Sequence, residues 1–167
     1  AALGEVIAEA RRLLERAGIE SAGHEALWIV EHALRLPAHH VVTDRDRLLI
    51  PAELVAVRGL VKRRVAHEPL QYILGTQEFC GLEFDVNQAV LNPRPETEQL
   101  EKYVAQWISA EREATIVDVC TGSGCIAVAL ARLRPRARVI ATDLSNPSLN
   151  IARQNAVRHA VGELSLI

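Results

Sequence analysis

The sequence predicts an α/β fold in which a small all-α bundle and a β-hairpin connector precede the first part of a parallel sheet. Three observations support this prediction. Apolar residues recur at helical spacing through the first 66 residues, the pattern changes after Gln71, and strand and helix patterns alternate beyond Thr115. We therefore expect a helical domain at residues 1–70, a connector with a hairpin at 71–94, and a sheet domain at 95–167.

Three helices are expected in the first domain. The first has apolar residues at helical spacing from Leu3 and ends at Gly18, because glycine tolerates positive φ. Ser21 can cap the second, which stops before Pro37. Pro51 suits the first turn of the third. Together these helices predict a bundle.

The connector shows strand-like patterns. Tyr72-Ile73-Leu74 and the alternating apolar residues at 82, 84 and 86 are punctuated by Gly75 and Gly81, which predicts strands and a hairpin. Cys80 is interpreted as a small buried apolar residue, as free cysteine commonly is.

The stretch Asn92-Pro-Arg-Pro-Glu-Thr-Glu98 opens a further helix. Pro95 suits its first turn, and Glu96 and Glu98 lie near its N-terminus, where the helix dipole favours negative charge. Helix capping is the simplest interpretation of these acids.

The last part of the chain predicts a parallel βαβ arrangement. An apolar strand at 116–119 leads into a glycine turn, a helix from Ile126, a second strand ending at Asp143, and a helix from Pro147. We count two strands of a sheet. Because two parallel strands alone would leave edges and an apolar face uncovered, we expect the chain to be a piece of a larger domain.

The glycine turn predicts a site for a small charged ligand. Gly122 and Gly124 let the backbone approach a ligand, and the following helix directs unpaired N–H groups toward it. Asp143, at the end of the second strand, suits hydrogen bonds from ribose hydroxyls. Asp118, just before the turn, would repel a pyrophosphate but attract an ammonium or sulfonium group. This favours S-adenosylmethionine over NAD.

Two alternatives stay open for the turn. The dinucleotide-binding pattern Gly-x-Gly-x-x-Gly/Ala is satisfied by Gly122, Gly124 and Ala127. A dehydrogenase is therefore one alternative function. Asp118 could also serve only to bond amides of the turn.

Composition and charge limit which classes of function and partner remain. The net charge is −2, and the first 75 residues balance basic against acidic side chains, so attraction to nucleic acid is not expected. Three cysteines at irregular spacing fit neither a disulfide framework nor a zinc site, so no metal is expected. No apolar run is long enough for a membrane helix. We expect a monomer in the cytoplasm that does not act at a membrane.

Several stretches together resemble the PrmC/HemK family, the protein-(glutamine-N5) methyltransferases of peptide-chain release factors. They are Arg-Val-Ala-His-Glu-Pro-Leu-Gln-Tyr-Ile-Leu-Gly at 64–75, Glu78-Phe79 with Gly81-Leu82, Asn-Pro-Arg-Pro-Glu-Thr-Glu at 92–98 and Asp-Val-Cys-Thr-Gly-Ser-Gly-Cys-Ile-Ala at 118–127. The resemblance covers nearly the whole chain.

The resemblance implies a Rossmann-like S-adenosylmethionine-dependent methyltransferase fold, of which only the first part is present, behind a helical domain that docks the release factor. It implies that Asp143 holds the ribose and that the turn wraps the methionine end of the cofactor, the cofactor-binding residues being Asp118, Cys120, Thr121, Gly122, Ser123, Gly124 and Asp143. Arg94, Glu96 and Thr97 would lie near the site. Cys120 stands where many members have a glycine, so we expect a backbone conformation there that a side chain tolerates.

The resemblance also implies the reaction, which is methylation of the glutamine side-chain nitrogen in the Gly-Gly-Gln loop of release factors. The family's Asn-Pro-Pro-Tyr motif is not in this sequence, so the catalytic residues are expected beyond Ile167. The alternatives are a nucleic-acid amino-methyltransferase of the adenine N6 type and a non-catalytic cofactor-binding fragment.

Overall fold

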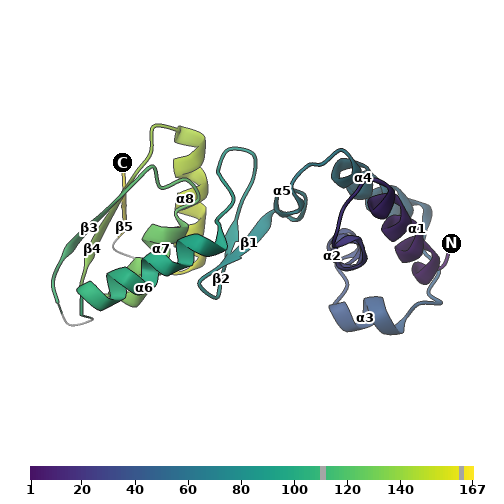
Figure 1. Cartoon of the computed structure of the whole chain (residues 1–167), viewed down its shortest axis with the longest axis horizontal. Helices are drawn as coiled ribbons and strands as arrows, with labels where there is room; N and C mark the ends of the chain where they lie inside the picture. Colours follow the sequence, from purple (N-terminus) through teal and green to yellow (C-terminus); the bar gives the residue numbers. More distant parts are fainter. Residues whose placement is uncertain (110–111, 162–163) are drawn as a thin grey trace. The chain divides into compact units, whose positions relative to one another are not determined.

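The computed structural model describes residues 1–109, 112–161 and 164–167. They form two compact units, Ala1–Leu74 and Gly75–Ile167, and each is described separately (Figure 1).

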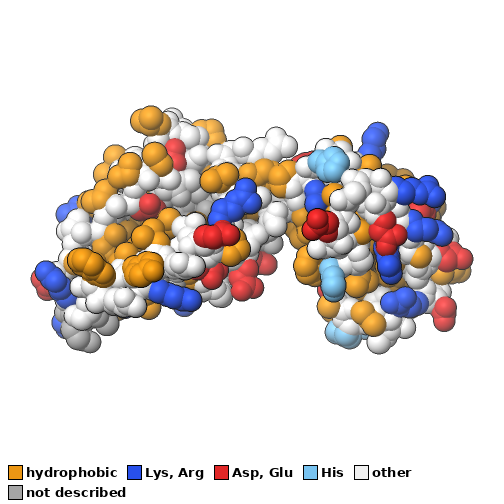
Figure 2. Space-filling model, viewed as in Figure 1, with side chains coloured by type: hydrophobic (Ala, Val, Ile, Leu, Met, Phe, Trp, Pro, Cys, Tyr) orange, Lys and Arg blue, Asp and Glu red, His pale blue; other side chains and the backbone are white. Residues whose placement is uncertain are grey.

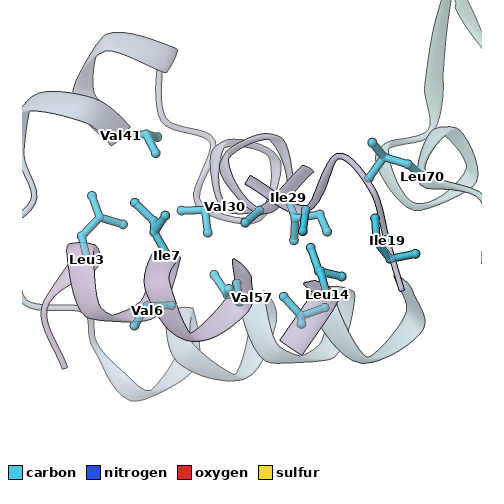
Figure 3. Close-up of a cluster of buried hydrophobic side chains, with 14 of the residues drawn as sticks. Leu3, Val6, Ile7, Leu14, Ile19, Ile29, Val30, Val41, Val57 and Leu70 are labelled. Carbon is cyan, nitrogen blue, oxygen red and sulfur yellow. The ribbon is translucent and has the colours of Figure 1, made fainter. Parts of the chain in front are cut away.

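The first unit is a helical bundle. Apolar side chains of α1, α2 and α4 point into one shared core, where Leu3, Leu14, Ile29, Val30 and Val57 are almost fully buried (Figure 3). Burial of such side chains is the main stabilising contribution, about 1.5 to 3 kcal/mol for each large one. The helices are α1 (Leu3–Arg16), α2 (Ala22–Leu34), α3 (Ala38–Thr43), α4 (Pro51–Val65) and α5 (Leu70–Leu74).

The expected helix ends are mostly found. Gly18 has φ +77° and follows Ala17, the C-cap of α1, and Pro51 is the first residue of α4. Ser21 occupies the N-cap position of α2, but its side chain accepts no capping hydrogen bond. The short helix α3 was not predicted from the sequence.

One side-chain pair joins two helices of this bundle. Arg64 of α4 donates two hydrogen bonds to Glu25 of α2, at 2.5 Å and 3.2 Å, and the two side chains are only 16% and 11% exposed. This ion pair therefore lies largely out of water.

The prediction of a strand at Tyr72-Ile73-Leu74 is wrong, because these residues belong to α5. The amides of Tyr72 and Ile73 both donate to the carbonyl of Pro69, which is helical bonding. Leu70 and Ile73 are buried, at the i, i+3 spacing of one helix face.

The second unit begins with the hairpin of β1 (Thr76–Phe79) and β2 (Leu82–Asp85), which pair antiparallel. Cys80 and Gly81 form its turn, both with positive φ, as a two-residue hairpin connection requires. The turn position leaves Cys80 half-buried, so the expectation of a buried residue is wrong. Phe79 and Phe84 are buried against α7 (Cys125–Leu133) and α8 (Asn146–Arg158).

A parallel sheet with the strand order β3-β4-β5 follows the hairpin. It has three strands among the described residues rather than the expected two, because a short strand follows the last helix. These elements are η1 (Pro95–Thr97), α6 (Glu98–Trp107), β3 (Thr115–Val119), α7 (Cys125–Leu133), β4 (Arg138–Thr142), α8 (Asn146–Arg158) and β5 (Leu164–Leu166).

The two faces of the sheet differ. Val139 and Ala141 on β4 are completely buried together with Ala127 of α7. On the opposite face of β3, Val117 and Val119 are 55% and 69% exposed, and hydrophobic side chains lie at the surface of this unit (Figure 2). The parallel sheet therefore has an exposed apolar face, as the sequence predicted.

Among the described residues, no helix is both long enough and apolar enough to span a membrane.

Candidate cofactor site

The site is built at the carboxyl ends of β3 and β4. These strands are parallel neighbours, with Val119 opposite Thr142, so the residues that follow them meet at one edge of the sheet. The amide of Thr121 donates to the carbonyl of Thr142 at 2.9 Å, which fixes the turn after β3 to the end of β4. Ligands of open α/β sheets bind at this edge.

The turn from β3 to α7 uses the left-handed region of φ three times. Cys120 has φ +62°, Gly122 +56° and Gly124 +77°. The expectation that Cys120 has a conformation suited to a side chain is therefore wrong, since this region favours glycine and costs an L-residue about 1 to 3 kcal/mol.

The two glycines serve different purposes. A Cβ on Gly124 would lie 3.0 Å from the Cβ and 3.1 Å from the Cα of Ala152, so Gly124 lets α8 pack closely on the turn. A Cβ on Gly122 would meet no atom within 4 Å. Gly122 thus leaves open space beside the backbone, on which a ligand could lie.

Asp118 is half-buried at the end of β3 and accepts a hydrogen bond from the hydroxyl of Thr121 at 2.7 Å. Burial raises the pKa of Asp118 above its ordinary value, and the negative charge of Asp143 adds to this rise. The hydrogen bonds from Thr121 and from the amide of Ala127 partly offset it. A cation beside Asp118 would relieve this penalty.

Asp143 connects the turn to the start of α8. One carboxylate oxygen accepts from the amide of Gly122 and the other from the amide of Ser145, both at 2.9 Å. Because a carboxylate offers about four lone-pair sites, each oxygen keeps capacity for one further donor such as a ribose hydroxyl. Asp143 therefore shapes the turn and can still bind a ligand.

Asn155 of α8 was not singled out from the sequence. Its fully buried side chain donates to the carbonyl of Ser123 at 2.8 Å and bonds both backbone groups of Asp85. The available signal was an asparagine on the apolar helix face formed by Ile151, Ala152 and Ala156.

The segment around Arg94 lies in a different environment. Arg94 and Glu96 are exposed, Thr97 is half-buried, and the three residues lie at and in η1. Within the described residues, no identified hydrogen bond joins them to the turn, so their place near the cofactor stays a prediction. Glu98 accepts from the amide of Cys80 at 3.0 Å, which ties α6 to the hairpin turn.

Metal chemistry has no evident site in the described ranges, which contain no group of three or more His, Cys, Asp or Glu residues placed to hold an ion. The geometry instead presents two carboxylates and a turn of backbone amides.

Two family models match the chain. Residues 5–75 match the PrmC N-terminal domain, and residues 97–166 match ribosomal protein L11 methyltransferase (PrmA). The second match covers the parallel sheet, the glycine turn and both acids. With this turn at the carboxyl ends of its strands, the second unit is the first part of a Rossmann-like methyltransferase fold.

Individual relatives agree with these matches. A release factor glutamine methyltransferase of Geobacter sulfurreducens is 45% identical over 149 residues, covering 89% of this chain and 52% of its own. One of Nitratidesulfovibrio vulgaris is 39% identical, covering 98% of this chain and 55% of its own. A bifunctional methyltransferase of Rickettsia bellii is 32% identical, covering 89% and 31%.

These matches confirm the resemblance to the PrmC/HemK family noted in the motifs of the chain. The chain spans about half the length of the release factor methyltransferases it matches. Among solved structures, a protein-L-isoaspartate O-methyltransferase aligns with 65% of this chain and 36% of its own at a TM-score of 0.38 and 14% identity, a likeness too weak to define the fold.

Proposed function

We propose that this chain forms the docking domain and the cofactor-binding half of an S-adenosylmethionine-dependent enzyme that methylates a glutamine side chain of peptide-chain release factors. The names of its relatives support this activity, and the N-terminal unit carries the domain match specific to PrmC. The glutamine is that of the factor's Gly-Gly-Gln loop. A substrate that acts in translation termination would place the enzyme in the cytoplasm.

The placement of Asp118 and Asp143 carries the cofactor assignment. Asp118 lies near the end of β3, and Asp143 directly follows the neighbouring parallel strand β4; the amide of Gly122, in the turn after β3, bonds Asp143. Asp118 would face the positively charged methionine end and Asp143 the ribose hydroxyls. The open space beside Gly122 and the free lone pairs of Asp143 fit such a ligand.

When bound, S-adenosylmethionine supplies an electrophilic methyl group on a positively charged sulfur. The chain's own residues bind and orient. Asp118 offers its half-buried negative charge, the turn from Cys120 to Gly124 presents backbone groups, and Asp143 fixes that turn to α8. Because an amide nitrogen is a weak nucleophile, alignment with the methyl group carries much of the catalysis, and no residue of this chain is assigned as a base.

The alternative of nucleic-acid methylation gains no support. The relatives from Geobacter sulfurreducens and Nitratidesulfovibrio vulgaris are named for release factors, and the first unit has equal numbers of basic and acidic side chains. A protein substrate that docks on the helical unit is the better explanation.

The proposal is tested by labelling. The product of the full reading frame is incubated with S-adenosylmethionine labelled in its methyl group and a purified release factor. We expect label in the factor, and none in a factor whose Gly-Gly-Gln glutamine is replaced by alanine. Equal labelling of the two factors would refute the glutamine as the acceptor.

A further inference from the structure

A buried amide side chain lies behind the turn, outside the set of residues assigned to the cofactor. Asn155, in the middle of α8, is fully buried and makes three hydrogen bonds. Its Oδ1 accepts from the amide of Asp85 at 2.7 Å, and its Nδ2 donates to the carbonyl of Asp85 at 3.0 Å and to the carbonyl of Ser123 at 2.8 Å.

We propose that Asn155 is a positioning residue of the cofactor site, which holds the glycine turn in its binding conformation and couples it to the end of hairpin strand β2. This inference rests on the proposed cofactor site. The residue does not touch the ligand, and it acts through the peptide group between Ser123 and Gly124.

The bond to Ser123 fixes a peptide group at the centre of the turn. Holding the Ser123 carbonyl sets the orientation of the next amide, and the amide of Gly124 donates to the carbonyl of Thr121 at 2.9 Å. Gly124 also has φ +77° and packs on Ala152, one turn of α8 before Asn155. Loss of the Nδ2 donor would leave a buried carbonyl without this partner and free the peptide group to rotate.

The bonds to Asp85 make the same side chain part of the hairpin. Asp85 is paired with Thr76 of β1, and Asn155 bonds both the amide and the carbonyl of Asp85, as a further neighbouring strand would. Two residues at the C-terminal end of α8, its last residue and its C-cap, support the hairpin separately. Arg158 pairs with Glu83 and Asp85, and the ring of His159 bonds the Glu83 carbonyl at 2.8 Å. Asn155 also bonds the carbonyl of Ser123, so it connects the hairpin to the turn.

Two substitutions separate positioning from simple packing. Asn155→Ala removes all three bonds and leaves a space. Asn155→Asp keeps the volume and the acceptor for the Asp85 amide but loses both donors and places negative charge against two carbonyl oxygens. If Asn155 acts only by filling space, the aspartate variant should bind S-adenosylmethionine more tightly than the alanine variant. If its two N–H donors are required, the aspartate variant should bind no more tightly.

The experiment uses the product of the full reading frame at a temperature well below its melting transition. We expect both variants to bind S-adenosylmethionine about tenfold or more weakly in calorimetry, the usual effect of losing a buried hydrogen bond. KM for the cofactor should rise while KM for the release factor stays unchanged. Asn150→Ala is the matched control, because Asn150 lies on the same helix, is exposed and bonds only Arg153 among the described contacts.

Hydrogen exchange provides a readout that needs no ligand. The amides of Gly122 and Gly124 should exchange faster in Asn155→Ala than in the wild type and in Asn150→Ala. Unchanged exchange, or cofactor affinity within twofold of the wild type in folded variants, would overturn the inference. A wild-type protein that binds no S-adenosylmethionine would instead refute the proposed function, and the exchange data would still decide the role of Asn155 in the turn.

Discussion

The hydroxyl of Thr121 donates to the carboxylate of Asp118 across the start of the glycine turn, with Oγ1 and Oδ2 2.7 Å apart. This bond stabilises a charge that burial disfavours, since burial is the largest influence on the raised pKa of Asp118. The carboxylate is thus kept in a position that costs stability, which is typical of residues retained for binding.

Asp118→Asn is expected to stabilise the protein and weaken cofactor binding. Because the folded-state pKa is raised, the folded protein binds more protons than the unfolded chain between the unfolded and folded pKa values. The free energy of unfolding therefore falls as pH rises through that window, and the penalty persists at neutral pH. Asp118→Asn has no carboxylate at this position, so its free energy of unfolding should not show this fall.

Denaturant unfolding between pH 3 and pH 8 measures this effect. Because Asp118 is partly exposed, we expect a gain on the order of 1 kcal/mol or less at pH 7, which vanishes below about pH 4. Affinity for S-adenosylmethionine should drop about tenfold. A variant less stable than the wild type at pH 7 would argue against a burial penalty.

Asp143→Ala should weaken binding of S-adenosylmethionine by about 1 to 3 kcal/mol, because the proposed ribose contact is lost together with the anchor of the Gly122 amide. Calorimetry measures this change, with Asp46→Ala in the helical unit as the control. Unchanged affinity in a folded Asp143→Ala protein would remove this residue from the site.

Cys120→Gly should raise the free energy of unfolding by up to about 1 kcal/mol, because Cys120 has φ +62° and glycine relieves its strain. The mirror substitution, Gly122→Ala at φ +56°, should lower it by a similar amount. Urea denaturation of the two variants gives both values. Changes of the same sign would contradict the left-handed backbone at these positions.

Arg64→Ala should destabilise the helical unit by about 3 kcal/mol, because it leaves the carboxylate of Glu25 buried without its partner. The neighbouring Arg63 provides a matched control. Its pair with Glu68 leaves the arginine 43% exposed, so Arg63→Ala should cost no more than about 1 kcal/mol. Fluorescence of Trp28, in α2, reports unfolding of this unit, and equal losses would contradict the account.

The long helices of the first unit, α1, α2 and α4, could be predicted because their apolar residues keep helical spacing over ten or more residues. Short elements could not. Leu70–Leu74 is a run of five residues that fits either a strand or one helical turn, and Leu164–Leu166 is too short to show any period. In both cases tertiary packing decides the structure.

The elements of the candidate site could be predicted, since a strand, a glycine turn and an acid at the end of the next strand are all visible in sequence. The hydrogen bonds that join these elements could not. The contacts of Asp143 with Gly122 and of Asn155 with Ser123 join residues 21 and 32 positions apart, which no local pattern encodes. The strain at Cys120 was missed because a backbone conformation was inferred from the side chain alone.

The most direct test of the central claim is mass spectrometry of a release factor after incubation with S-adenosylmethionine and the product of the full reading frame. The account predicts one added methyl group on the side chain of the Gly-Gly-Gln glutamine, and a smaller methylated fraction when the enzyme carries Asp143→Ala at limiting cofactor. An unmodified factor, in the presence of an enzyme that binds the cofactor tightly, would contradict the assignment of release factors as the substrate.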